Sequence, residues 1–199
     1  MKHFLINKLA VSELQFGIVF TGTKFSDQFD FILDKNLIIS GYDENVLKLF
    51  MRRLKEYREK YGKPAKACIV FDDMVGQVPW EMPLILHLFT TFRWYGVSIF
   101  VSTQYVYKIN PTVRTVCDYA FIWAQDNKRC YEAIYVTFGL GFENYKEFKR
   151  ELDSIVKEQY FCMFYNKEKR NFEERYGGYK APANIPQLKF RFSSKPKDK

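Results

Sequence analysis

The sequence predicts an α/β fold, a three-layer structure built on a mainly parallel sheet. Two observations support this class. Short runs of β-branched and aromatic residues alternate with amphipathic segments of helical length along most of the chain. One of these runs, Ala67–Phe71, contains no polar residue, as expected of a central strand that is covered on both faces of a parallel sheet. Strands and helices that alternate in this way pack as layers around one sheet.

The first half of the chain supplies most of the predicted sheet. An amphipathic helix is expected over His3–Leu14, and Asp43 is placed to cap a long helix that runs through Lys60. Gly62 and Gly96 each follow the end of a predicted helix. The strands predicted here are Phe16–Phe20, Leu37–Ser40, Cys68–Phe71 and Val97–Ser102, and a further helix is predicted over Pro83–Tyr95.

The second half continues the alternation. A loop containing Pro111 and Arg114 leads to a strand over Tyr119–Trp123. Near the end, Phe172–Tyr176 is expected to fold back as a hairpin on the last core strand. The elements predicted between these segments are the helices Glu132–Phe138 and Phe142–Glu158 and the strand Tyr160–Tyr165.

Composition indicates a globular protein with a basic surface. The chain has 199 residues, of which 47% are hydrophobic and 19% aromatic, and is expected to fold as one domain over residues 1–180. Residues 181–199 form a basic, proline-containing tail that is expected to be extended or disordered. The formal net charge of +8 favours a polyanionic partner such as nucleic acid, although solubility alone would also account for it.

The cysteines and the hydropathy pattern argue against several classes of protein. The four cysteines are widely separated, so neither a zinc site nor a disulfide framework is expected, and a reducing compartment is favoured. No apolar run reaches the length of a membrane span, and the first residues are too polar for a signal peptide.

Two adjacent carboxylates, Asp72 and Asp73, end the apolar strand. Ligands of open α/β sheets bind beyond the carboxyl ends of such strands. Two acids at this position can hold a divalent metal ion and polarise a water, which is the task of the Walker B acid in P-loop nucleotidases. The alternative is a solvated Asp-Asp turn that binds nothing.

A second strand also ends in polar residues. The segment Val97–Ser102 leads into Thr103 and Gln104, and a neutral amide can donate to a phosphate oxygen and accept from a water. If the two strands are neighbours, Gln104 reaches the same crevice as Asp72. The alternative for Gln104 is a hydrogen bond to loop backbone.

Two arginines flank the second strand in the sequence. Arg93 precedes it and Arg114 follows it. Either could stabilise the charge on a transferring phosphoryl group, including one bound by a neighbouring subunit. Each could instead form a surface ion pair or stack on an aromatic ring such as Trp94.

A phosphate-binding loop, the part that such a site needs, is missing from the sequence. Its form is G-x-x-x-x-G-K-[ST], between a strand and a helix. The nearest match, Gly17–Lys24, has its lysine one position late, and its Ile-Val-Phe interior favours a strand. We therefore reject this match and expect the chain to begin inside the helix that would follow such a loop.

Taken in order, these residues resemble the poxvirus-type genome-packaging ATPases, members of the FtsK–HerA superfamily of P-loop motors. The similarity covers roughly Gly17 to Tyr176, and its most specific part is the interval from the Asp-Asp pair to Gln104. The matching segments are Phe92–Ser98, Ser102–Gln104, Pro111–Asp118, Phe138–Gly139 and Tyr160–Tyr165. The resemblance implies a three-layer P-loop nucleotidase core that lacks its first strand and its P-loop.

The resemblance also implies roles for the candidate residues. Asp72 would be the magnesium-associated acid, Asp73 the acid that polarises the attacking water, and Gln104 the sensor of the γ-phosphate. Arg93 and Arg114 match positions where arginine is usual, without indicating which of them acts on a neighbouring subunit. Asp73 replaces the glutamate common in the wider superfamily, whose longer side chain would place the water differently.

These features lead to a primary functional hypothesis. The chain would be the Walker B-to-sensor portion of an ATP-driven motor that packages a viral genome into capsids, with ATP and Mg²⁺ as cofactors. Its partners would be double-stranded DNA, further copies of the chain in a homo-oligomeric ring, and portal or vertex proteins of the capsid. It would act in the virion or in the cytoplasm of an infected cell. Contacts to DNA are expected from Lys108 and from the tail residues Lys189, Arg191, Lys195, Lys197 and Lys199.

Two alternatives compete with this hypothesis. The chain could be a non-enzymatic nucleic-acid-binding module or an inactive paralogue of the ATPase. A metal-dependent nuclease is disfavoured, because no further acid or lysine has a suitable spacing to Asp72 and Asp73. We expect the missing loop to reflect a truncated or split gene rather than a true loss, and the chain alone to be almost inactive.

Overall fold

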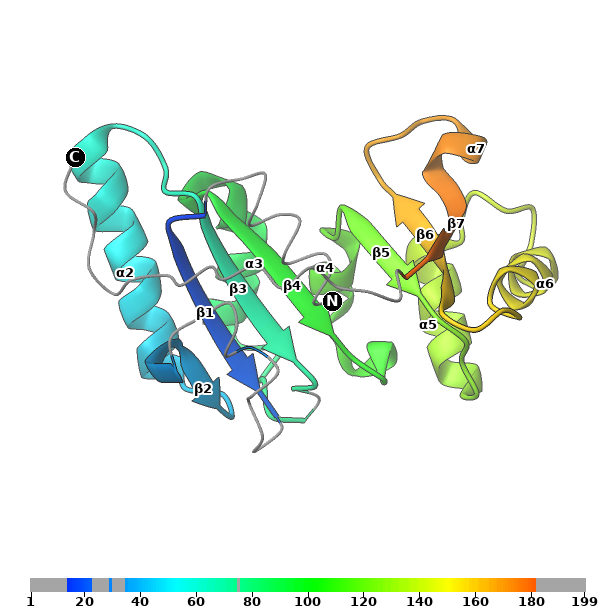
Figure 1. The fold of residues 1–199 in the computed structure, drawn as a ribbon, viewed down its shortest axis with the longest axis horizontal. Coiled ribbons are helices and arrows are strands. Elements are labelled where there is room, and N and C mark those ends of the chain that lie inside the picture. Colours follow the sequence, from blue (N-terminus) through cyan, green and yellow to red (C-terminus); the bar gives the residue numbers. More distant parts are fainter. Residues whose placement is uncertain (1–13, 23–28, 30–34, 75, 182–199) are drawn as a thin grey trace. The chain divides into compact units, whose positions relative to one another are not determined.

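The computed structural model describes residues 14–22, 29, 35–74 and 76–181, drawn as coloured ribbon in Figure 1. The chain divides into two compact units, one reaching to Gln104 and one beginning at Tyr105. The predicted helix over His3–Leu14 and the predicted tail lie outside the described residues, apart from Leu14 and Ala181. Both therefore remain predictions.

A four-stranded, wholly parallel sheet forms the first unit (Figure 1). The predicted parallel sheet and its strands are thereby confirmed. The arrowheads of β1, β3 and β4 point to the same edge, so the carboxyl ends of these strands meet there. In spatial order the strands are β2 (Ile38–Ser40), β1 (Phe16–Thr21), β3 (Ala67–Asp72) and β4 (Val97–Ser102).

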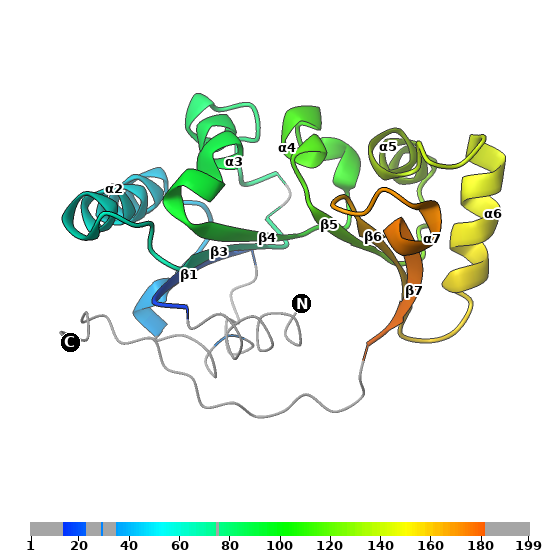
Figure 2. The same cartoon turned by 90° about the horizontal axis from the view of Figure 1, so that it is seen from above.

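Two helices cover one face of this sheet (Figure 2). They are α2 (Glu44–Tyr61) and α3 (Pro83–Tyr95), and a short 3₁₀ turn, η2 (Lys35–Leu37), precedes β2. Each helix buries an apolar stripe at helical spacing, as an amphipathic helix packed on a sheet must. The buried residues are Leu47, Met51 and Leu54 of α2 and Ile85, Leu88 and Phe89 of α3. At the centre, Phe71 stacks on Phe20 with ring centroids 5.4 Å apart.

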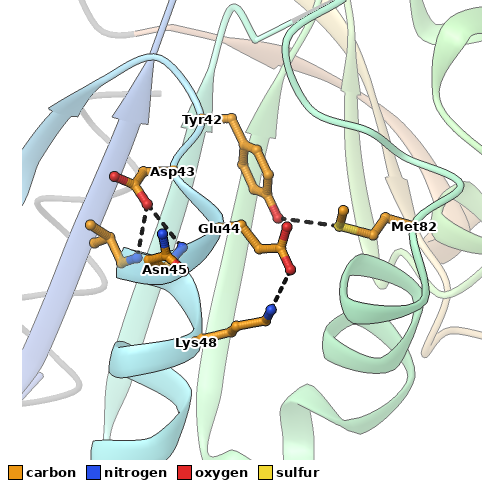
Figure 3. Close-up of polar contacts among 7 residues, drawn as sticks. Tyr42, Asp43, Glu44, Asn45, Lys48 and Met82 are labelled. Carbon is orange, nitrogen blue, oxygen red and sulfur yellow. Dashed lines mark hydrogen bonds and ion pairs between the residues drawn. The ribbon is translucent and has the colours of Figure 1, made fainter.

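The start of α2 is fixed by side-chain contacts (Figure 3). The Asp43 carboxylate accepts hydrogen bonds from the amides of Asn45 and Val46 at 2.9 and 3.1 Å, which confirms the predicted cap. The neighbouring Tyr42 hydroxyl donates to Met82 Sδ at 3.9 Å, just before α3. Burial, with a smaller contribution from nearby carboxylates, raises the pKa of Tyr42 to about 12, so the hydroxyl stays protonated. The beginnings of α2 and α3 are thus joined.

An antiparallel sheet forms the second unit. Its strands lie in the order β5 (Tyr119–Ile122), β6 (Phe161–Asn166) and β7 (Tyr176–Lys180). Residues from these strands and from two helices share one core cluster that includes Ile122, Ile134, Phe148, Leu152 and Met163. The helical elements of this unit are η3 (Val106–Lys108), α4 (Pro111–Thr115), α5 (Lys128–Phe138), α6 (Tyr145–Ile155) and α7 (Phe172–Arg175).

Several predicted boundaries in the second unit are wrong, and capping residues explain most of them. The segment around Pro111 is a short helix, because Asn110 caps it by accepting from the amide of Thr112 at 2.7 Å. Asn127 and Asn144 cap α5 and α6. These helices therefore begin at Lys128 and Tyr145, and not at the predicted Glu132 and Phe142. The predicted hairpin exists, but its second strand is β7; Phe172–Arg175 form the turn of helix that precedes it.

All four cysteines fall in described parts of the chain, and none forms a disulfide, as predicted. Burial raises the pKa of the Cys68 thiol to about 12, so it stays protonated at neutral pH. Within the described ranges, the structure contains no helix with the length and apolar character needed to span a bilayer.

Candidate functional site

Three candidate site residues of the first unit, Asp72, Asp73 and Gln104, lie at the carboxyl edge of the parallel sheet. β3 and β4 are adjacent, and Asp72 pairs in register with Ser102, the last residue of β4. Gln104 follows two residues later and is exposed. The prediction that Asp72 and Gln104 lie beyond neighbouring parallel strands is therefore confirmed.

Ser102 connects the two acids. Its hydroxyl donates to Asp72 Oδ1 at 2.5 Å. The amide of Asp73 donates to Ser102 Oγ at 3.1 Å and to the Ser102 carbonyl at 3.2 Å. One residue of β4 thereby holds both the carboxylate of Asp72 and the backbone of Asp73, and both positions are coupled to the strand that leads to Gln104.

Asp73 leaves the strand in a tight turn. Its φ of 49° lies in the left-handed region, which aspartate tolerates better than most residues. The turn is pressed against the end of β1, where the amide of Gly22 donates to the Asp72 carbonyl at 3.0 Å. A Cβ on Gly22 would lie 2.2 Å from the Asp73 carbonyl oxygen, so only glycine fits. The exposed Asp73 carboxylate is therefore presented by a turn that neighbouring backbone holds in place.

A row of polar side chains crosses the whole carboxyl edge. Ser40, Thr21, Asp72 and Ser102 stand in register on four successive strands. Registered residues of neighbouring strands point to the same face, and Phe71, the residue before Asp72, contacts Trp80 and Phe89 of the helical layer. The row therefore points to the face away from α3. Sequence reasoning missed Thr21 and Ser40, although both are polar residues that close apolar strands, which is the signal that singled out Asp72.

Arg93 does not share this edge. It lies in the last turn of α3, and its carbonyl accepts from the amide of Gly96 at 3.1 Å, just before β4 begins. The Gly96 carbonyl in turn accepts from the amide of Ala67, the first residue of β3. Arg93 is thus at the amino edge, one strand length or roughly 15–20 Å from Asp72. Within one chain it is separate from the Asp72–Gln104 site, and a catalytic role for it would require a neighbouring subunit.

Arg114 belongs to the second unit, where it holds two helices together. Its Nη1 donates to the carbonyl of Ala133 and to the hydroxyl of Thr137, both at 3.1 Å, which links α4 to α5. Its Nε is buried and has no hydrogen-bond partner. Desolvation lowers the pKa of the guanidinium from its usual value. These contacts are hydrogen bonds between two helices, and not the surface ion pair or the aromatic stack that the sequence offered as alternatives. The catalytic role of Arg114 stays a prediction.

The rejected phosphate-loop match, Gly17–Lys24, is a strand at its start. Residues from Gly17 to Thr21 belong to β1, which is hydrogen-bonded on both sides, to β2 and to β3. Amides committed to a sheet ladder are unable to wrap a phosphate. The rejection is therefore confirmed.

Asp72 and Asp73 are the described residues best suited to a divalent cation. Hard oxygen donors at a sheet edge suit Mg²⁺, which is usually held by one or two carboxylates together with substrate phosphates and water. Among the described residues, no group of three or more acids, histidines or cysteines is placed to hold a metal by itself. The donor set thus fits a magnesium–nucleotide complex better than a metal site built from protein alone.

No protein-family model matches the sequence. A curated relative, the uncharacterized protein 075L of Invertebrate iridescent virus 6, is 25% identical over 146 residues. The match covers 70% of this chain but only 55% of the relative, so the chain spans little more than half of that protein.

The fold is similar to solved structures of viral packaging proteins. The genome packaging NTPase B204 of Sulfolobus turreted icosahedral virus 2, in complex with ATPγS, superimposes with a TM-score of 0.61 and 18% identity, covering 90% of this chain and 88% of that one. Its AMP complex gives a TM-score of 0.63 at 17% identity with the same coverage. B204 of Sulfolobus turreted icosahedral virus, described as the DNA-packaging ATPase, gives 0.56. At this level of identity the similarity shows a shared fold, that of the genome-packaging NTPases.

Proposed function

We propose that this chain is the catalytic portion of an ATP-driven motor that packages a viral genome into capsids. The observation that carries the proposal is the adjacency of Asp72, Asp73 and Gln104 at the carboxyl edge of a fold shared with B204. The B204 structures hold ATPγS, AMP and AMPPCP, which supports a nucleotide site in a protein of this fold. The proposed cofactors are ATP and Mg²⁺, and the proposed partners are double-stranded DNA and further copies of the chain in a ring.

The proposed roles follow from the contacts at the edge. A bound magnesium ion would offset phosphate charge. Asp72, whose carboxylate accepts from the Ser102 hydroxyl, would hold this ion. Asp73, exposed on its turn, would accept a proton from an attacking water or orient that water. The side-chain amide of Gln104 can donate to a phosphate oxygen through Nε2 and accept from a water through Oε1, without a change of charge.

Ser102 connects Gln104, the proposed phosphate contact, to the two acids. It lies two residues before Gln104 and bonds to both acids. A displacement of Gln104 upon loss of the γ-phosphate would pull on the end of β4 and hence on the Asp73 turn. Hydrolysis and sensing would then be linked through a single strand end.

A non-enzymatic nucleic-acid-binding module remains the second candidate. The net charge of +8 and the exposed basic residues at the amino edge favour it. The two candidates differ in one outcome. A motor hydrolyses ATP when its phosphate loop is present, whereas a binding module does not.

The experiment tests hydrolysis in a chain extended at its amino end. The reading frame upstream of Met1 is determined, and any strand and Gly-x-x-x-x-Gly-Lys-Ser/Thr motif found there is expressed together with residues 1–199. Magnesium-dependent ATP hydrolysis that Asp73→Asn abolishes would support the motor. An upstream frame without such a motif, or an extended chain that neither binds nor hydrolyses ATP, would support the binding module.

A further inference from the structure

The amino edge of the parallel sheet, opposite the candidate site, gathers basic side chains around an exposed tryptophan. α2 and α3 both end there, and residues 62–66 lead from α2 into β3. The residues of this rim, here called the amino-edge patch, are Arg58, Lys60, Lys63, Lys66, Arg93 and Trp94.

Contacts between α2 and α3 hold the patch together as one surface. The Arg58 guanidinium donates to the Trp94 carbonyl at 2.5 Å and lies 4.5 Å from the centre of the Trp94 ring. This joins the last turns of α2 and α3, because the orphan carbonyl at the end of α3 receives a charged donor from α2. A Cβ on Gly96 would lie 1.9 Å from the Ala65 carbonyl oxygen, which shows how closely the connection before β3 packs against the end of α3.

The patch is exposed and positively charged. Lys60, Lys63, Lys66 and Arg93 are exposed, and Trp94 keeps 44% of its surface accessible. Across the described ranges, no acidic side chain forms an ion pair with Arg58 or with any of the three lysines, and the last ion pair along α2 joins Lys55 to Glu59 at 3.8 Å. Within the described part of the chain, the charges of Arg58, Lys60, Lys63 and Lys66 are therefore not neutralised by ion pairs.

We propose that the amino-edge patch binds the phosphate backbone of double-stranded DNA. Lysine and arginine contacts to phosphate give affinity without sequence readout, which suits a protein that moves along any sequence. Lys60, Lys63 and Lys66 follow one another from the end of α2 to the residue before β3, and all three side chains are exposed, so each is free to contact a phosphate. The choice of duplex DNA rests on the proposed function. The sequence analysis named other candidates for DNA contact, which do not belong to this patch. The tail lies outside the described residues, and Lys108 lies over the Tyr105 ring in the second unit.

The test compares two triple variants of the full 199-residue chain that remove the same charge. The first is Lys60→Gln with Lys63→Gln and Lys66→Gln. The matched control is Lys146→Gln with Arg150→Gln and Lys157→Gln, three exposed basic residues on and just after α6 that have acidic neighbours such as Asp153. A third variant, with arginine at the three amino-edge positions, keeps the charge. Binding to a fluorescent duplex is measured by anisotropy at about 50 and 200 mM salt.

The amino-edge variant is expected to bind at least about 10-fold more weakly at low salt, and its salt slope should fall by about 2 to 3. The control should stay within about 3-fold of the unmodified chain, and the arginine variant should bind normally. The proposal would be overturned if both glutamine variants bound DNA equally weakly or if neither bound more weakly than the unmodified chain. It would also be overturned if the unmodified chain did not bind duplex DNA. None of these results depends on ATP, so hydrolysis by the extended chain judges the proposed function separately.

Discussion

At the scale of single residues, Ser102 is the group on which the candidate site depends most. It donates to Asp72 and accepts from the amide of Asp73. We expect Ser102→Ala to lower the free energy of unfolding by about 1 kcal/mol, because a partly buried carboxylate loses its donor. Urea unfolding measures this change. Ser102→Thr keeps the hydroxyl on a strand-compatible side chain and should restore most of the stability; a threonine variant as unstable as the alanine variant would exclude the hydrogen bond as the cause.

The two acids should respond differently to substitution. In the extended chain, Asp73→Asn should abolish ATP hydrolysis and leave nucleotide binding intact, because the amide keeps the shape but loses the basicity. Asp72→Ala should instead weaken magnesium-dependent nucleotide binding. Steady-state hydrolysis and equilibrium binding, measured side by side, separate the two effects. Normal hydrolysis by Asp73→Asn would remove Asp73 from the catalytic assignment.

At the scale of elements, the end of β1 supports the turn that carries Asp73. Gly22→Ala would place a methyl group 2.2 Å from a backbone carbonyl, which has no room to move without displacing the turn. We expect a loss of about 2 kcal/mol or more in stability, with weaker nucleotide binding by the extended chain. Thermal unfolding is the measurement.

Gly177→Ala is the matched control for that substitution. Gly177 lies in β7, and a Cβ built there meets no atom within 4 Å. It should cost no stability, since alanine also restricts the unfolded chain. Equal losses in the two variants would mean that the close approach at Gly22 is not a constraint.

The sequence predicted the first unit better than the second, for physical reasons. Each strand of the parallel sheet is mainly apolar and ends in a polar residue. The existence and direction of the strands and the placement of Asp72 beside Gln104 could therefore be inferred. In the second unit, short elements depend on caps such as Asn110 and on pairing between distant strands. Neither is visible in hydrophobic periodicity, so α4 and the antiparallel pairing of β5 with β6 were missed, whereas the hairpin that follows β6 was predicted.

Arg93 shows that proximity in sequence does not imply proximity to the candidate site. It stands near Gln104 along the chain, but β4 separates the two, and a strand carries the chain from one edge of the sheet to the other. The polar row that includes Thr21 was missed for the complementary reason. Its members are far apart in sequence and are brought together by register alone.

At the scale of the whole molecule, Asp72, Asp73 and Gln104 lie at the carboxyl edge, but the phosphate-loop motif is missing from the sequence. The amides of β1 are committed to the sheet. We therefore expect the 199-residue chain alone to bind ATP weakly and to hydrolyse almost none, because loop amides and a lysine provide most triphosphate contacts. A hydrolysis assay with and without Mg²⁺ measures this. Turnover well above background would mean that the chain contains its own phosphate-binding loop. The rejected match, Gly17–Lys24, would then have to be reconsidered.

The central claim, that the carboxyl edge is a nucleotide site, is tested most directly by an experimental structure of the extended chain with Mg²⁺ and ATPγS. We predict that the terminal phosphate lies within hydrogen-bonding reach of Gln104, with the metal beside Asp72 and the exposed carboxylate of Asp73 facing the thiophosphate. A nucleotide bound at the amino edge or in the second unit, with the Asp72–Asp73 turn left in contact with solvent alone, would contradict the account.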